Sequence, residues 1–119
     1  MRKLIFYTAL TLVLSSCEHL VINASEAAQH VGKFATVKGT VASVKSLNMG
    51  KPNEVHLLNL NRPHPNQDLT VVINHRYIRR FLPLTEYEGK KVQIMGKIYL
   101  YKGKPQIRLK TANRMRVEK

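Results

Sequence analysis

One long segment with alternating residues, 33–47, restricts the fold of this chain more than any other feature. Small or apolar residues alternate there with polar and aromatic ones, and this period of two predicts a β-strand. Gly39 lies in the middle of the segment, where a glycine weakens a strand and marks a bend. A long strand needs such a bend if it is to join both sides of a small barrel. The segment therefore predicts a small β-barrel.

Further β-strands are predicted after this segment, and they cover residues 54–60, 69–74, 91–100 and 105–110. The stretches 48–53 and 61–68 are expected to be loops, because they contain glycine and proline. Residues 101–104 are expected to form a hairpin turn, with Gly103 at the position that favours glycine. Residues 111–119 are expected to be a basic tail.

Two short helices are expected to interrupt the β-pattern. Asn23 and Glu26 have the spacing of a capping box that opens a helix of one or two turns, and Gly32 ends it. A second helix is predicted over residues 75–82, where apolar residues recur at helical spacing, and Pro83 limits its length.

The order of elements is thus three strands, a short helix and a two-strand hairpin. It predicts an all-β fold with small α content, namely a five-stranded Greek-key OB-fold barrel with a short helix between strands three and four and a short N-terminal helix. An SH3-like barrel is the alternative, but it lacks the helix before the last hairpin. The predicted domain covers residues 24–119, with Val72 and Ile94 expected in its core.

The N-terminal segment has the pattern of an exported protein. Arg2 and Lys3 precede the uncharged run 4–14, and together they match the n- and h-regions of a signal peptide, predicted over residues 1–16. The run is too short to cross a bilayer, which needs about 20 apolar residues.

The end of this segment, residues 14–17 (Leu-Ser-Ser-Cys), resembles the lipobox of bacterial lipoproteins. The resemblance implies that Cys17 is lipidated and anchors the chain to the membrane, and that residues 17–23 form a lipidated tether. Cys17 is the only cysteine, so an internal disulfide is excluded and lipidation explains the lone thiol. In a Gram-negative envelope, Glu18 after the cysteine implies the outer membrane, facing the periplasm. The alternative is an ordinary signal peptide that is cleaved elsewhere.

A second resemblance covers about residues 26–117 and concerns the domain itself. The chain resembles a small bacterial OB-fold family described as nucleic-acid-binding-like, whose members occur alone or appended to nucleases. The residues that carry this likeness are Gly39 to Val44, Leu60, Pro63, Pro65 to Gln67, Leu69 to Ile73, Gly89 to Val92, Gly96 to Ile98 and Tyr101 to Ile107. The resemblance implies an OB-fold and a nucleic-acid ligand.

The charge of the chain points to a polyanionic partner. The sequence has 20 lysine and arginine residues against 7 acidic ones, a net charge of +13 and an isoelectric point near 10.3. Removal of the signal peptide takes away Arg2 and Lys3 and leaves +11. A domain this basic is suited to nucleic acid, anionic lipid headgroups or acidic polysaccharide.

Catalytic and metal-binding patterns are not evident in the sequence. The acidic residues are scattered, and no phosphate-binding loop, nucleophile elbow or Cys-x-x-Cys pair occurs. His56, His64 and His75 are widely spaced, without a cysteine or aspartate cluster beside them, and are expected to be surface or half-buried residues. The sequence therefore predicts no enzyme, no cofactor and no metal.

A binding face can be assigned from the OB-fold expectation. Ligands of OB-folds cross strands two and three, between the loops that follow strand one and strand four. The residues expected there are Lys45, Lys51, His56, Asn59, Arg62, Tyr101, Lys102, Lys104 and Arg108. The basic residues would neutralise phosphates, and Tyr101 would stack on a base. It is the one ring expected on this face, because Tyr99 can point inward.

These observations predict a non-enzymatic, envelope-anchored module that binds single-stranded nucleic acid through a basic face, without sequence preference. The alternative hypothesis is an envelope interaction protein whose basic face binds anionic lipid headgroups or another envelope protein.

Overall fold

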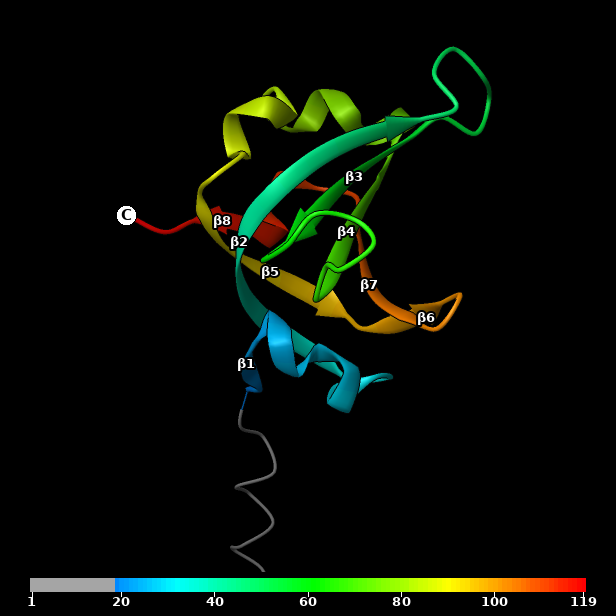
Figure 1. The fold of residues 1–119 in the computed structure, drawn as a ribbon. Coiled ribbons are helices and arrows are strands. Elements are labelled where there is room, and N and C mark those ends of the chain that lie inside the picture. Colours follow the sequence, from blue (N-terminus) through cyan, green and yellow to red (C-terminus); the bar gives the residue numbers. More distant parts are fainter. Residues whose placement is uncertain (1–18) are drawn as a thin grey trace, which may run out of the picture.

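Residues 19–119 are described by a computed structural model, and they fold mainly into β-structure (Figure 1). The strands in this part of the chain are β1 (Val21–Asn23), β2 (Phe34–Leu47), β3 (Val55–Leu60), β4 (Leu69–Asn74), β5 (Lys91–Lys97), β6 (Tyr99–Tyr101), β7 (Lys104–Leu109) and β8 (Met115–Val117). The predicted signal peptide, Cys17 and Glu18 lie outside the described residues. Among the described helices, none is long and apolar enough to cross a membrane.

The long strand β2 organises the sheet, and Figure 1 shows how strongly it curves. Its first half, through Thr40, pairs antiparallel with β5, whereas its second half, from Val41, pairs antiparallel with β3. The register shifts between Val41 and Ser43, close to Gly39. A Cβ atom at Gly39 would lie only 3.2 Å from Leu60 Cδ1. The predicted bend is confirmed, since the strand changes partners at this point.

The complete sheet differs from the five-stranded barrel that the sequence predicts. The strands follow the order β6-β7-β4-β3-β2-β5-β8, with β1 parallel to β2 and β7 parallel to β4, so the fold is an open mixed sheet of eight strands. The expected fourth strand is split at Ile98 into β5, which pairs with β2, and β6, which pairs with β7. The added strands β1 and β8 lie in the expected tether and tail. Each has only three residues, which is too short a segment for an alternating pattern to be recognised in the sequence.

The strands β5 and β7 are not paired with each other in the sheet, but their side chains pack closely. A Cβ atom at Gly96 of β5 would lie 2.6 Å from Ile107 Cγ2 of β7. Both residues are buried. Side-chain packing at Gly96 therefore brings the two halves of the sheet together where hydrogen bonding does not.

The core lies on the concave side of this sheet. Its fully buried residues come from alternate strand positions and include Val37, Val41, Leu58, Leu60, Leu69, Val71, Ile73, Val92, Ile94 and Ile107. Ile94 is buried as expected. Val72 is not, because its neighbours Val71 and Ile73 take the inward positions and leave it half-buried on the other side. Thr70 and Asn74 flank Val72 on this side, so the alternation of polar residues along β4 does mark it as the outward side.

Four short 3₁₀ helices occur among residues 19–119: η3 (Ala24–His30), η4 (His75–Arg80), η5 (Leu84–Tyr87) and η6 (Ala112–Arg114). The predicted start of η3 is confirmed, since Glu26 Oε1 accepts from the Asn23 amide at 2.9 Å. The predicted helix over 75–82 is the shorter η4, which ends at Arg80 because the chain is extended at Phe81, and η5 is a further turn after Pro83 that was not predicted. Figure 1 shows η3 and the pair η4–η5 at opposite ends of the sheet.

Candidate nucleic-acid interface

One surface of the sheet faces away from the core across β2, β3, β4, β7 and β6. We refer to it as the outer face. The paired registers and the burial pattern assign it the residues Ser43, Lys45, Leu47, Val55, Leu57, Asn59, Thr70, Val72, Asn74, Tyr99, Tyr101, Lys104, Gln106 and Arg108. None of these positions holds a carboxylate, so cations at its edges face no opposing charge on the same surface.

A row of hydrogen-bonded side chains crosses the outer face from β2 through β3 to β4. Asn59 donates its amide to Ser43 Oγ at 3.1 Å and accepts from the Thr70 hydroxyl at 3.2 Å. Gln67, from the loop after β3, donates to Thr70 Oγ1 at 3.0 Å. Asn59 is only 2% exposed. Its polar atoms are therefore satisfied within the protein, and it supports the face rather than contacting a ligand.

The next row is apolar in the middle and cationic at both ends. Lys45 pairs with Leu57, Leu57 with Val72, and Val72 with Arg108, on four neighbouring strands. Leu57 and Val72 are half-buried, while Lys45 and Arg108 are exposed. This row combines an apolar floor with charged groups on either side.

Arg108 is held in place by Tyr99. Its Nε donates to the Tyr99 hydroxyl at 2.7 Å, and its guanidinium lies 4.6 Å from the centre of the Tyr99 ring. That hydroxyl donates in turn to Gln106 Oε1 at 3.0 Å. Partial burial raises the pKa of Tyr99, outweighing the opposing effect of the bond from Arg108, so the phenol keeps its proton.

Tyr99 was not among the predicted site residues, yet it lies on the outer face with Tyr101. The signal was present in the sequence, because residues two apart on a strand point to the same side. The same face thus presents two tyrosines, where the sequence analysis expected one.

A hollow of about 430 Å³ continues the outer face beyond Arg108. It is lined by Val55, Val72, Asn74, Arg76, Tyr77, Arg108, Leu109 and Lys110. The guanidinium groups of Arg76 and Arg80 lie 5.5 and 5.0 Å from the centre of the Tyr77 ring. The predicted site residues do not include Arg76, Tyr77 or Lys110.

The other predicted residues lie around this face. Tyr101 is 51% exposed, with the Lys102 ammonium 5.4 Å from its ring centre. The Lys104 ammonium donates to Pro65 O in the loop after β3. Lys51 is exposed in the loop that joins β2 to β3. Arg62 is exposed, but it forms a 3.0 Å ion pair with Asp68 that offsets its charge.

His56 is the one predicted residue that points away from the outer face. It lies three positions before Asn59 on β3 and therefore on the opposite side of the sheet, where it is 7% exposed. There it meets Glu54 and His75. Burial lowers the pKa of His56 and His75 lowers it further, while Glu54 raises it.

The structure thus brings together histidines that the sequence analysis kept apart. The signal that could have found them is the spacing of Glu54 and His56, two apart on one strand, with His75 directly after the neighbouring strand. The 19-residue separation of the two histidines hides this proximity, because β3 and β4 are antiparallel.

Comparison with protein families and with curated proteins finds no match to this chain. Among solved structures, a protein assigned as an aspartyl-tRNA synthetase from Leishmania major shares the fold, with a TM-score of 0.52 and 8% identity. The match covers 92% of this chain, which spans a quarter (25%) of the length of that one. The likeness concerns the fold alone.

A second solved structure is a protein assigned as a nucleic acid-binding lipoprotein from Klebsiella pneumoniae subsp. pneumoniae. It matches with a TM-score of 0.43 and 13% identity, over 81% of this chain and 78% of that one. At this level of similarity the two structures differ too much for one to inform the other.

Proposed function

We propose that this chain is a non-enzymatic, envelope-anchored module that binds single-stranded nucleic acid across the outer face, without sequence preference. The observation that carries the proposal is the row of Lys45, Leu57, Val72 and Arg108, an apolar floor between two exposed cations. Unpaired bases can lie on apolar and aromatic groups while the backbone phosphates meet the cations.

The arrangement of strands supports an OB-type binding surface. The strands β2, β3, β4, β5 and β7 follow the chain order of an OB-fold, with η4 and η5 between the third and the fourth of them. We infer that these five are the barrel, and that the contact of Gly96 with Ile107 takes the place of a paired seam. In that assignment β3 and β4 are the second and third strands, which OB-folds use for ligands.

The lack of sequence preference follows from how the polar groups of the outer face are used. Both polar atoms of the Asn59 side chain are engaged by Ser43 and Thr70. The Tyr99 hydroxyl is likewise engaged by Gln106 and Arg108. Groups that are satisfied within the protein have little capacity left to read base edges, so affinity would come from charge and stacking.

The absence of an enzyme activity is part of the same proposal. The outer-face positions contain no carboxylate and no histidine, so an acid–base pair is missing beside a bound strand. Binding rather than cleavage is the function that these residues support.

We also propose that a lipid on Cys17 anchors the chain to the membrane, and the described residues limit how far the domain can lie from it. Leu20 O already accepts from the Thr36 amide at 2.9 Å, and β1 begins at Val21. Only the three steps from Cys17 to Leu20 would then separate the lipid from the sheet, at most about 10 Å of extended chain. The domain would lie close to the membrane surface.

A competition experiment tests the binding proposal against the alternative of anionic lipid headgroups. Residues 19–119 would be titrated with a fluorescent single-stranded oligonucleotide and then with unlabelled single strand, duplex of the same sequence, or vesicles containing anionic lipid. We expect the single strand to displace the probe most effectively. Displacement by vesicles at lower concentration than by single strand would favour the lipid alternative instead.

A further inference from the structure

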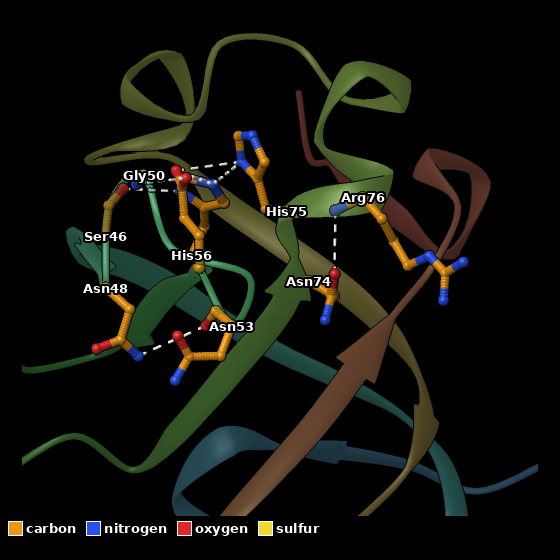
Figure 2. A network of polar contacts seen from close by, with 9 residues as sticks. Ser46, Asn48, Gly50, Asn53, His56, Asn74, His75 and Arg76 are labelled. Carbon is orange, nitrogen blue, oxygen red and sulfur yellow. Dashed lines mark hydrogen bonds and ion pairs between the residues drawn. The ribbon is translucent and has the colours of Figure 1, made fainter.

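Glu54, His56 and His75 form a compact triangle of ligating atoms on the inner side of the sheet, away from the outer face. His56 Nε2 lies 2.9 Å from His75 Nδ1 and 3.4 Å from Glu54 Oε2. His75 Nδ1 lies 3.1 Å from the same carboxylate oxygen. Figure 2 shows the two labelled imidazole rings turned toward one another, His56 from β3 and His75 from the start of η4.

These distances are close to those of a tetrahedral metal site. Bonds of about 2.0–2.1 Å to nitrogen and about 2.0–2.2 Å to oxygen, at tetrahedral angles, put neighbouring ligand atoms roughly 3.3 Å apart. The three observed separations, 2.9, 3.1 and 3.4 Å, need only a small outward shift to accept an ion.

Without a cation, the three atoms cannot all be joined by hydrogen bonds at the same time. A carboxylate only accepts hydrogen bonds, and each ring nitrogen donates or accepts but not both. If His75 Nδ1 donates to Glu54, the lone pairs of His56 Nε2 and Glu54 Oε2 still face each other at 3.4 Å. If His56 Nε2 donates as well, two N–H groups meet at 2.9 Å. A cation among the three atoms removes both conflicts.

Neighbouring groups orient the ligands as they do around protein metal ions. The Ser46 hydroxyl lies 2.7 Å from His56 Nδ1, so that a proton on Nδ1 leaves the Nε2 lone pair directed into the triangle. The Gly50 amide donates to Glu54 Oε1 at 3.0 Å and leaves Oε2 for the ion. Both contacts come from the end of β2 and the loop after it, as Figure 2 shows for Ser46 and Gly50.

The backbone holds the three residues in this arrangement. Val55, between Glu54 and His56, pairs with Asn74 of β4, and the His75 amide donates to Glu54 O at 3.2 Å. Glu54 and His56 are buried, whereas His75 is exposed. A fourth coordination position would therefore open toward solvent beside His75.

We propose that Glu54, His56 and His75 bind one Zn²⁺ or a similar divalent transition-metal ion. Two imidazoles and one carboxylate match the ligands that Zn²⁺ takes in three-residue sites with an additional water. Mg²⁺ and Ca²⁺ prefer oxygen ligands and more of them, so they do not fit this set. The ion would join the loop between β2 and β3 to the start of η4.

The test uses the full chain purified in detergent, freed of metal and titrated with Zn²⁺ by calorimetry. We expect saturable binding of one ion per chain, with no response to Mg²⁺. Co²⁺ in place of Zn²⁺ should give the visible absorption of a four-coordinate site. The variant His75→Ala should abolish both signals, and since this residue is exposed, the fold should tolerate the change.

The matched control is His64→Ala, which removes another exposed histidine from the loop after β3. It should bind Zn²⁺ as the natural chain does. Ser46→Ala should weaken binding about 10- to 100-fold, as loss of a partner that orients a ligand does. Absence of saturable Zn²⁺ binding by the natural chain, or equal binding by His75→Ala, would overturn the proposal.

Discussion

At the scale of the residue, Arg108 and Tyr99 illustrate how the outer face would present an oriented cation to the proposed ligand. The ring and hydroxyl of Tyr99 hold the guanidinium in one place while leaving it exposed. A planar group that is already oriented loses less conformational freedom when it binds a phosphate than a free side chain does. Arg108 should therefore contribute more to binding than an average surface cation.

Replacing Arg108 tests this contribution. Arg108→Ala should weaken single-strand binding and reduce the log–log salt slope by about 0.7, the value for one lost phosphate contact. Fluorescence anisotropy at several salt concentrations measures both quantities. Lys38→Ala is the matched control, because it removes an exposed cation from the half of β2 that pairs with β5. Equal losses in the two variants would mean that only total charge matters.

Substitution of two apolar residues, Ile94 and Val72, tests which positions belong to the core and which to the outer face. Ile94 is fully buried, so Ile94→Ala should lower the free energy of unfolding by about 2–5 kcal/mol. Val72 is half-buried on the outer face, and Val72→Ala should cost only about 1 kcal/mol. Urea denaturation of the two variants measures the difference. Similar losses would show that Val72 belongs to the core and that the outer face is wrongly assigned.

At the scale of the element, the sequence predicts those features that have a local signature. Gly39 marks the bend of β2, and Asn23 with Glu26 marks the start of η3, because a glycine and a capping pair act within a few residues. The strands β1 and β8 have no such signature. They exist because neighbouring strands offer free edges, which is a property of the assembled sheet.

The contact of Gly96 with Ile107 provides a test at this scale. Gly96→Ala places a methyl group against Ile107 Cγ2 and should cost about 1–3 kcal/mol of stability. Ile107→Leu removes that branch methyl and, in the double variant, should recover part of the loss, so that the two changes are not additive. Additive losses in denaturant unfolding would contradict close packing of β5 on β7.

The candidate site was only partly predictable for a related reason. Lys45 and Arg108 were assigned to a ligand-binding face because OB-folds place ligands on known strands, and both lie on the outer face. Tyr77 was missed because the hollow beside Arg108 forms only when η4 folds back against the sheet. His56 was wrongly assigned to the same side as Asn59, because residues three apart on a strand point to opposite sides of the sheet.

At the scale of the whole molecule, β1, the first described strand after the proposed anchor, and the outer face lie on different parts of the sheet. β1 pairs with the half of β2 that joins β5, whereas the outer face covers the half that joins β3. A lipid on Cys17 would therefore hold the domain by one half and leave the other half available for a ligand.

The anchor itself can be tested directly. Mass spectrometry of the protein from its native host should show Cys17 as an acylated N-terminal residue, because residues 14–17 resemble a lipobox. Cys17→Ser should remain unacylated and should leave the membrane fraction. Detection of an intact Met1, or of cleavage after Cys17, would contradict the anchor while leaving the binding proposal untouched.

The central claim, binding of single-stranded nucleic acid by charge and stacking, is tested most directly by one anisotropy titration repeated over a series of salt concentrations. The Lys104 ammonium is bonded to Pro65 O, and the other cations of the outer face and its hollow are Lys45, Arg76, Arg108 and Lys110, so the number of phosphate contacts can reach four. We predict saturable binding at low salt, independent of base sequence, with a log–log slope between about −2 and −3. Absence of binding at low salt, or binding that salt does not weaken, would contradict the account.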